Sequence, residues 1–452
     1  MVGIITGLLL PKFMSIDNYA YYRIFTLYLM FNGFAHLGFN DGILVRYGSF
    51  DGKDIPKNKF RAYFSFIIIF QLIIAFILII IFLFFIKDTN RLVIFLFVIA
   101  NMILLNVTTN LSITYQITKN FKVFSTNTVI QNLLLMLFIT FLVLTNNTNF
   151  IIVIICQTVV NVIILIKYII ETKALIFGDR IRLFKSKDEI TNIFKTGFPV
   201  LIGNLMGLVI FGIGRVVVER YYSLNDFAYF SFAISLLGLI FTFITAISNL
   251  LYPYIARVEK NRAGDYYKQL YFVIIGITSV SLLTFFVLKL IVINFIPTYI
   301  PAIKITLILF PLIIFRSIIN LISINFYKVL SLNKEYNKNN LIALVIALLL
   351  NLVGVFLDFS LVGITIVNLV SFYLWLLYTD LFFQRRLKIK ISRYHISTIV
   401  VSIVFILCGI LNIWIGFLIY TLFLVLFLLV LFKKSDVSLN IAQKIKNKGK
   451  GV

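Results

Sequence analysis

Few ionisable side chains stand inside the long apolar stretches of this sequence, and two of them are arginines. Arg316 lies deep within the apolar stretch 303–326, and Arg215 lies toward one end of the stretch 198–218. An arginine at the centre of a membrane span costs about 2.5–3.5 kcal/mol on insertion scales, so it usually faces protein or a water-filled cavity. A guanidinium group in such a cavity can bind phosphate oxygens. We therefore predict that both arginines face such a cavity and contact a substrate there.

Each arginine also has a purely structural interpretation. Arg316 could bond to backbone carbonyls or to Asn320 one turn away, and Arg215 could extend its side chain toward the nearer membrane surface. Asn204 and Asn320 flank the two arginines along the chain and are predicted to supply amide groups to the same substrate. Most other asparagines within apolar stretches are interpreted as groups that join helices by hydrogen bonds.

Asp41 is the one carboxylate clearly inside an apolar stretch, within the segment Gly38–Gly42. A carboxyl group in this setting could bind and release a proton that drives transport. It could equally pair with Arg46, whereas His36 is interpreted as a packed histidine. Asp41 is therefore the predicted coupling group, with the Arg46 pairing as the alternative.

The residues that would bind a metal or a nucleotide are scarce. The sequence holds two cysteines, both in apolar stretches, and two histidines far apart, so it predicts neither a disulfide nor a metal site. It also lacks a glycine-rich phosphate loop followed by Lys and Ser or Thr, which argues against ATP hydrolysis. We predict no catalytic residues and no cofactor.

The elements that position these residues must be membrane helices. Of the 452 residues, 61% are hydrophobic and 13% are charged, whereas soluble proteins carry about 25% charged residues. This excludes a water-soluble enzyme and predicts an all-α, polytopic membrane protein of about 14 transmembrane helices. An incomplete span covers 1–13, and the full spans lie at 24–45, 62–86, 92–112, 123–145, 150–170, 198–218, 229–254, 271–295, 303–326, 341–357, 361–382, 396–413 and 415–432.

Lysine and arginine are distributed unevenly between the connections. About 32 of the 41 basic residues lie in alternate connections and in the C-terminal tail, which the positive-inside rule places in the cytoplasm. The net charge of +24 is then mainly a signal of topology. We predict a multi-pass protein of the cell membrane with a cytoplasmic C-terminus, the lipid bilayer as partner and no nucleic-acid partner.

An internal repeat with an offset of 208 residues organises the chain. Residues 15–22 read SIDNYAYY and residues 223–230 read SLNDFAYF, while Tyr63-Phe64 matches Tyr271-Phe272 at the same offset. An even number of spans in each half gives a parallel repeat, related by an axis along the membrane normal. Two such lobes would leave a cleft between them and provide alternating access by rocking.

The repeat defines the predicted domains. They are an N-terminal six-helix lobe at 1–170, a cytoplasmic linker at 171–197, a C-terminal six-helix lobe at 198–382, two additional helices at 396–432 and a basic cytoplasmic tail at 433–452. The span 198–218 maps onto a first helix that would begin about ten residues before Met1. The expectation is that the native protein starts upstream.

Several segments resemble the oligosaccharide flippases (Wzx-type) of the multidrug/oligosaccharidyl-lipid/polysaccharide exporter superfamily. They are 10–20, Leu37–Phe39 with Arg46 after it, Gly197–Pro199, Gly214-Arg215 and Phe227–Ala233. The resemblance implies a two-lobe secondary transporter in the bacterial inner membrane. It would flip a polyprenyl-diphosphate-linked oligosaccharide from the inner to the outer leaflet for surface polysaccharide of the O-antigen or capsule type. Other membrane proteins of polysaccharide assembly would be its partners.

Two departures and two alternatives accompany the resemblance. Family members often carry Asp before the arginine of the seventh helix, where this chain has Gly214, and a sodium site is not supported because only Asp358 and Asp380 occur in the relevant spans. The first alternative, a multidrug or cation antiporter of the same superfamily, would need more acidic residues in its cavity to bind cations. A membrane polysaccharide polymerase would carry a larger outer loop than any that this chain offers.

Overall fold

The computed structural model describes residues 5–48, 55–179, 187–259 and 262–433. Across these ranges the chain is all-helical, with no strand, and twelve helices are long and apolar enough to cross a membrane. The predicted all-α, polytopic architecture is therefore confirmed. The basic tail at 433–452 lies outside the described residues beyond Lys433.

The chain forms two compact units, Met1–Ser231 (unit 1) and Phe232–Val452 (unit 2), which are described separately below. The division falls within helix α11 (Leu224–Ala256). Helix α10 (Lys187–Tyr221) begins inside the segment predicted as a linker and belongs to unit 1. The lobes at 1–170 and 198–382 stay predictions.

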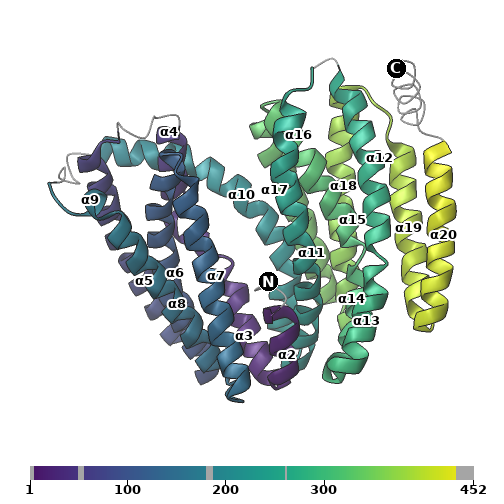
Figure 1. The fold of residues 1–452 in the computed structure, drawn as a ribbon, viewed down its shortest axis with the longest axis horizontal. Coiled ribbons are helices and arrows are strands. Elements are labelled where there is room, and N and C mark those ends of the chain that lie inside the picture. The colour runs from purple at the N-terminus through teal and green to yellow at the C-terminus, as the bar shows by residue number, and fades with distance from the viewer. Residues whose placement is uncertain (1–4, 49–54, 180–186, 260–261, 434–452) are drawn as a thin grey trace, which may run out of the picture. The chain divides into compact units, whose positions relative to one another are not determined.

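Unit 1 is built around α6, which contacts α3, α4, α5, α7 and α8. Its elements, drawn in purple to teal in Figure 1, are η1 (Ile5–Leu9), α2 (Leu10–Phe13), α3 (Ile16–Leu29), η2 (Asn32–His36), α4 (Phe39–Tyr47), α5 (Lys57–Phe85), α6 (Thr89–Ile117), α7 (Phe121–Leu144), α8 (Phe150–Glu171), α9 (Lys173–Ile176) and α10.

Buried amide side chains join the helices of unit 1. Asn161 on α8 donates a hydrogen bond to Asn101 on α6 (2.7 Å), and Gln131 on α7 donates one to Asn161 (2.9 Å). These asparagines join helices as expected.

The apolar stretch 24–45 differs from the full span that the sequence predicts, because the helix is interrupted. α3 ends at Leu29, a 3₁₀ turn covers Asn32–His36, and α4 starts at Phe39. Leu37 (φ 47°) and Gly38 (φ 86°) both lie in the left-handed region, which a right-handed helix cannot contain. Hydropathy reports the length of an apolar stretch but does not detect a break in the helix within it.

Glycines bring α4 against α10 at very short range. A Cβ atom on Gly42 would lie 2.1 Å from the Ile193 carbonyl oxygen, and one on Gly38 would lie 2.5 Å from the backbone nitrogen of Phe198. Close backbone approach through small residues is a common packing mode of membrane helices. The segments around Gly38 and Gly197, which the sequence singled out separately, are therefore in contact.

Unit 2 contains the rest of α11 and the elements that follow it. They are α12 (Ala263–Ser281), α13 (Thr284–Phe295), η5 (Pro297–Tyr299), α14 (Ala302–Leu309), α15 (Leu312–Ser317), η6 (Ile318–Ser323), α16 (Ile324–Val329), α17 (Asn333–Phe356), α18 (Leu361–Leu387), α19 (Ser392–Ile410) and α20 (Ile413–Lys433). The predicted span 303–326 is broken at Pro311, which lacks a backbone N–H, and then passes through the π-helix η6. Arg316 lies between these two irregularities.

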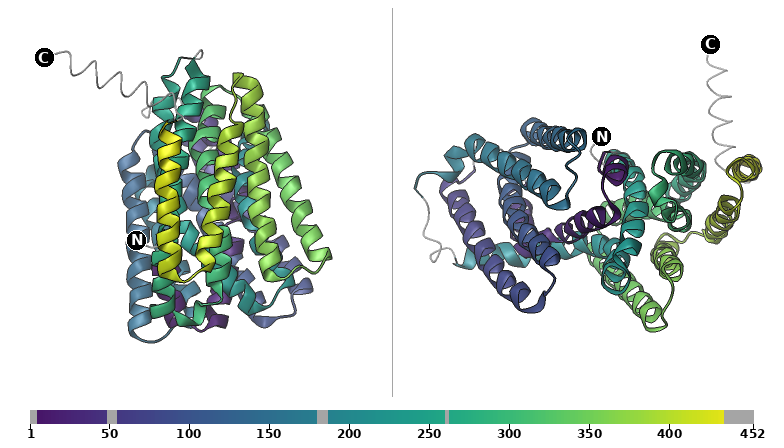
Figure 2. Two further views of the ribbon diagram at one scale, coloured as in Figure 1. Left: turned by 90° about the vertical axis from the view of Figure 1, so that its right-hand side faces the viewer. Right: turned by 90° about the horizontal axis from the view of Figure 1, so that it is seen from below.

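Helices α19 and α20 form an antiparallel pair after the last helix of the predicted repeat, and the left view of Figure 2 shows them side by side. Lys289 on α13 donates to the carbonyl oxygens of Gly409 (3.0 Å) and Leu411 (3.2 Å) at the end of α19. A lysine at this position satisfies carbonyls that a helix end leaves free. Lys289 is thus a structural cation.

Local features recur at the predicted offset of 208 residues. Ser15 accepts a hydrogen bond from the backbone N–H of Asn18 at the start of α3, and Ser223 accepts one from the backbone N–H of Asp226 at the start of α11. Both serines act as N-caps. The repeat remains a prediction. Equivalent N-caps at positions 208 residues apart are consistent with it.

Candidate functional site

Two buried arginines meet in unit 1. Arg215 on α10 is 4% exposed, and its Nη2 donates to the backbone carbonyl oxygen of Arg23 on α3 (3.2 Å). Arg23 is also buried, and its own Nη2 donates to the Ser231 carbonyl oxygen (3.4 Å). The contact therefore ties α3 and α10 together and places two guanidinium groups near each other.

The positive charge of this pair is not balanced by a carboxylate. Within the described ranges neither Arg23 nor Arg215 forms an ion pair, and the Nε atom of each is buried without a hydrogen-bond partner. Arg23 lies 5.8 Å from the ring centre of Tyr19, whose π-face gives partial compensation. A buried charge without a counter-ion costs several kcal/mol. The two Nε atoms are therefore buried hydrogen-bond donors that the described residues leave unused.

The carboxylate nearest along α10 is occupied elsewhere. Glu219 is 3% exposed, lies 2.9 Å from Nη1 of Arg91 on α6 and accepts a hydrogen bond from the Tyr28 hydroxyl (2.8 Å). Arg91, Tyr28 and Glu219 thus join α6, α3 and α10 one turn beyond Arg215. Glu219 is not free to neutralise the arginine pair.

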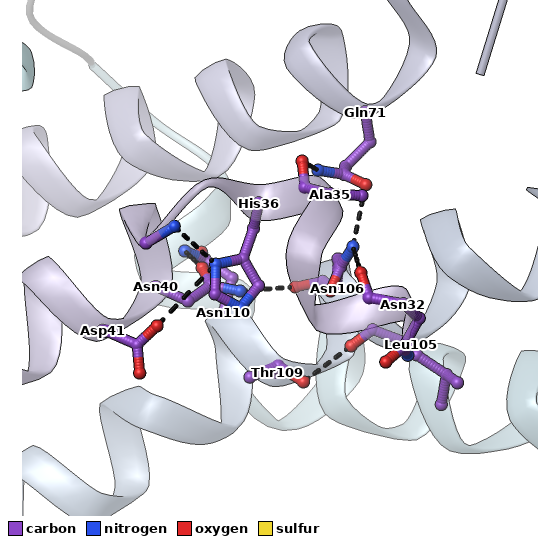
Figure 3. A network of polar contacts seen from close by, with 11 residues as sticks. Asn32, Ala35, His36, Asn40, Asp41, Gln71, Leu105, Asn106, Thr109 and Asn110 are labelled. Carbon is purple, nitrogen blue, oxygen red and sulfur yellow. Dashed lines mark hydrogen bonds and ion pairs between the residues drawn. The ribbon is translucent and has the colours of Figure 1, made fainter. Parts of the chain in front are cut away.

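The break between α3 and α4 is held by amide side chains, as Figure 3 shows. Gln71 donates to the carbonyl oxygen of Ala35 (2.9 Å), and Asn106 donates to that of Asn32 (3.1 Å) and to the Gln71 Oε1 atom (2.9 Å). Irregular backbone inside a membrane protein persists only where its polar groups have partners. Asn106 and Gln71 therefore position the segment that carries His36 and Asp41.

Asp41 lies in the first turn of α4 and faces His36. The Asp41 Oδ2 atom is 3.9 Å from the His36 Nδ1 atom, which accepts a hydrogen bond from the Gly38 N–H (3.1 Å). The alternative pairing of Asp41 with Arg46 is not made, because Arg46 forms its ion pair with Glu189 (3.4 Å). The coupling role of Asp41 stays a prediction.

Arg316 and Asn320 lie one turn apart in unit 2 and face α11. The Arg316 guanidinium lies 4.2 Å from the ring centre of Phe241, which is a cation–π contact. The Asn320 carbonyl oxygen accepts from the Ser248 hydroxyl (2.6 Å), two turns along α11 from Phe241. Both residues are half-buried. The predicted pair is therefore held together on one helix, with its cation on an aromatic ring.

The remaining predicted site residue, Asn204, is exposed on α10. It precedes Arg215 by three helical turns, about 16 Å along the axis. The structure thus does not bring Asn204 to the arginine that it was expected to flank. Its role in substrate binding stays a prediction.

Sequence reasoning missed Arg23, Glu219 and the Gln71–Asn106 pair. Arg23 directly precedes the apolar stretch at 24–45, so hydropathy does not mark it as a buried charge, whereas the structure buries it in α3. The signal that could have found it is its place in the 14-residue helix that begins at the Ser15 cap. A helix counted from this cap includes Arg23 as its eighth residue, in the third turn.

Comparisons with known proteins agree with this architecture. Residues 1–259 match the model of a family described as polysaccharide biosynthesis protein. No curated protein sequence matches the chain.

Two solved structures are similar to the chain. One is a lipid II flippase, MurJ, in an inward closed conformation, with a TM-score of 0.64 and 16% identity over 95% of each chain. The other is an inward-facing multidrug resistance MATE family transporter of the multidrug/oligosaccharidyl-lipid/polysaccharide exporter superfamily, with a TM-score of 0.55 and 15% identity. That match covers 86% of this chain and 94% of the other.

The family match covers more than half of the chain, and the two likenesses extend over nearly all of it. The chain therefore belongs to the polysaccharide biosynthesis protein family, with the fold of the membrane transporters of the multidrug/oligosaccharidyl-lipid/polysaccharide exporter superfamily.

Proposed function

We propose that this protein is a secondary transporter that flips a polyprenyl-diphosphate-linked oligosaccharide from the inner to the outer leaflet by alternating access. The product would serve the synthesis of a surface polysaccharide of the O-antigen or capsule type. The observation that carries this proposal is the Arg23–Arg215 pair, two buried guanidinium groups in unit 1 without an ion-pair partner among the described residues.

A diphosphate fits the chemistry of this pair. Guanidinium groups bind phosphate oxygens through two parallel N–H donors, and the Nε atoms of both arginines have no other partner. The substrate anion would supply the charge compensation that the protein lacks. A neutral lipid or a free cation would leave the two charges unbalanced, which disfavours a multidrug antiporter of cationic compounds.

Arg316 is the proposed phosphate-binding cation of unit 2. Its guanidinium lies over the face of Phe241, a contact that favours a cation. Asn320 on the same helix, and Asn204 on α10, would donate to sugar hydroxyls. Each of these contributions can be tested in its own unit.

The setting of the proposed activity follows the sequence topology. The protein would lie in the bacterial inner membrane with its C-terminus in the cytoplasm, beside other membrane proteins of polysaccharide assembly. The fold similarity to a lipid II flippase makes lipid II the rival substrate. Both lipids carry a diphosphate, so the sugar part decides between them.

The proposal is tested with purified protein in liposomes. Fluorescent polyprenyl-diphosphate oligosaccharide is placed in the inner leaflet, and its arrival in the outer leaflet is followed with a membrane-impermeant quencher. We expect faster flipping than in protein-free liposomes, and competition by unlabelled oligosaccharide lipid that exceeds competition by lipid II. Stronger competition by lipid II would assign the rival substrate, and no acceleration with either lipid would reject the flippase.

Variants then connect flipping to the arginines. Arg215→Ala and Arg316→Ala should each lower the flipping rate at least tenfold, while Arg316→Lys should retain part of it because the charge remains. Arg220→Ala and Lys304→Ala are matched controls, since both side chains are exposed on helices of the same units. Full activity of the Arg215→Ala and Arg316→Ala variants would remove these residues from the mechanism.

A further inference from the structure

A fully buried carboxylate lies in unit 2. Asp380 on α18 has no exposed surface, and its two oxygens accept hydrogen bonds from the hydroxyls of Tyr267 (2.6 Å) and Tyr271 (2.7 Å) on α12. The Tyr267 hydroxyl also lies 3.4 Å from that of Ser323 on η6. Asp380 therefore joins α18 to α12, and Tyr267 extends the contact to η6.

The other titratable group of this cluster is a histidine from the additional helices. The Nε2 atom of His395 on α19 lies 3.3 Å from the Asp380 Oδ2 atom. The imidazole is buried, and its Nδ1 atom has no hydrogen-bond partner. His395 thus connects α19 to the core of unit 2 through a titratable side chain.

No permanent cation compensates Asp380 among the described residues. The remaining polar rings facing the cluster are phenols: Tyr327 from α16, Tyr373 from α18 itself, and Tyr394 from α19, which stacks on Tyr271. On α12, Lys268 pairs with Asp265 (3.0 Å). On α13 and α15, Lys289 binds backbone carbonyls and Arg316 lies on Phe241.

The other charged side chains of the neighbouring elements lie at the surface or are half-buried without an ion pair to this cluster. On α16 and α17 they are Lys328, Lys334, Glu335 and Lys338. On α18, α19 and their connection they are Arg385, Arg386, Lys388, Lys390 and Arg393, all exposed. Among the described residues, only a proton can therefore balance the charge of Asp380 within the cluster.

The corresponding place in unit 1 is built differently. Tyr63 stands 208 residues before Tyr271 and donates to the carboxylate of Glu189 (2.7 Å). That carboxylate also lies 2.9 Å from the Lys59 Nζ atom and 3.4 Å from an Arg46 nitrogen. The residue 208 positions after Lys59 is Tyr267, so a phenol replaces the fixed cation in unit 2.

We propose that Asp380 and His395 together form a proton-binding site of the transporter. With one proton the pair has no net charge, in keeping with its burial, while loss of that proton leaves a single negative charge and gain of a second leaves a positive one. Release of the proton weakens the contact between α19 and α18. The site couples flipping to a proton gradient, a step that rests on the proposed function.

Proton binding is tested without any substrate, because the chain has only two histidines. Protein labelled with ¹⁵N-histidine and carrying His36→Gln gives imidazole NMR signals from His395 alone. We expect these signals to change between about pH 5 and pH 8, and the midpoint to move by at least one pH unit when Asp380→Asn is added. An unchanged midpoint, or signals that do not respond to pH, would overturn the site.

A second variant separates the proton from the packing. Tyr271→Phe removes one hydrogen bond to Asp380 but keeps both titratable groups, so its His395 signals should still respond to pH. Asp265→Asn on the same helix α12 is the matched control and should change nothing, because this carboxylate is exposed. Loss of the response in the Asp265→Asn protein would show that any change on α12 abolishes it.

Coupling is then measured in liposomes with an imposed pH gradient. The unmodified protein should flip substrate several-fold faster with the gradient than without it, and the Asp380→Asn and His395→Gln proteins should flip at one rate in both conditions. A gradient effect that survives both substitutions would overturn the coupling. Absence of flipping by the unmodified protein would instead reject the proposed function and leave the NMR result standing.

Discussion

A Cβ atom on Gly197 would lie 1.9 Å from the carbonyl oxygen of Gly38, so α10 and α4 touch backbone to backbone at this point. Gly197→Ala must therefore push two helices apart. We expect the free energy of unfolding to fall by about 3 kcal/mol, at the upper end of overpacking effects. Thermal unfolding of the purified protein measures the change.

Gly238→Ala on α11 is the matched control, because a Cβ atom there meets nothing within 4 Å. Alanine favours a helix over glycine by about 1 kcal/mol, so this variant should unfold at the same or a higher temperature. Equal unfolding temperatures of the Gly197→Ala and unmodified proteins would contradict the close approach of α4 and α10.

Gln71→Leu should destabilise unit 1 by removing support from the helix break. The Gln71 side chain is fully buried and bonds both the Ala35 carbonyl oxygen and Asn106. A buried carbonyl without a partner costs about 1–3 kcal/mol. The thermal midpoint in detergent should fall accordingly.

Thr109→Val on α6 provides the comparison for Gln71→Leu. The Thr109 side chain is exposed, and its hydroxyl bonds only to the Leu105 carbonyl oxygen of its own helix. This substitution should leave the thermal midpoint within error. A Gln71→Leu protein as stable as the Thr109→Val protein would show that the break needs no amide partners.

The sequence predicted the apolar elements well, because long runs of Ile, Leu and Phe signal membrane helices without reference to tertiary structure. It failed where the backbone departs from a helix. The interruption after Leu29 depends on carbonyl partners supplied by Gln71 and Asn106, which lie on other helices. Hydropathy along one segment carries no information about such partners.

Part of the candidate site was predictable, because hydropathy also reveals charged residues inside apolar stretches. Arg215 and Arg316 stand out because a charge within an apolar stretch is costly, and the structure buries the first and half-buries the second. Arg23 did not stand out, because it lies just before the apolar stretch that begins at residue 24 and not inside it. Its burial results from packing against α10, a contact between segments almost 200 residues apart.

Arg91 and Glu219 should respond unequally to substitution. Arg91→Ala leaves the Glu219 carboxylate buried without a counter-ion, and breaking a buried ion pair in this way costs about 3–5 kcal/mol. Glu219→Gln keeps an acceptor for the Tyr28 hydroxyl and leaves Arg91, which is 29% exposed, able to reach solvent. Thermal unfolding should therefore rank Arg91→Ala as clearly the less stable variant.

The double variant completes this comparison. Arg91→Ala combined with Glu219→Gln should be more stable than Arg91→Ala alone, because the second change removes the uncompensated charge. Additive losses in the double variant would mean that the two side chains contribute independently.

Asp41→Asn distinguishes the two carboxylate–histidine pairs of the chain. The His36 Nδ1 atom that faces Asp41 at 3.9 Å already accepts a hydrogen bond from the Gly38 N–H, so this nitrogen carries no proton to share. In the Asp380–His395 pair the facing Nε2 atom has no such donor. We therefore expect flipping by the Asp41→Asn protein to keep its dependence on the pH gradient, while flipping by the Asp380→Asn protein loses it. The opposite result, with dependence lost only in Asp41→Asn, would assign proton coupling to unit 1 and require His36 to turn away from Gly38.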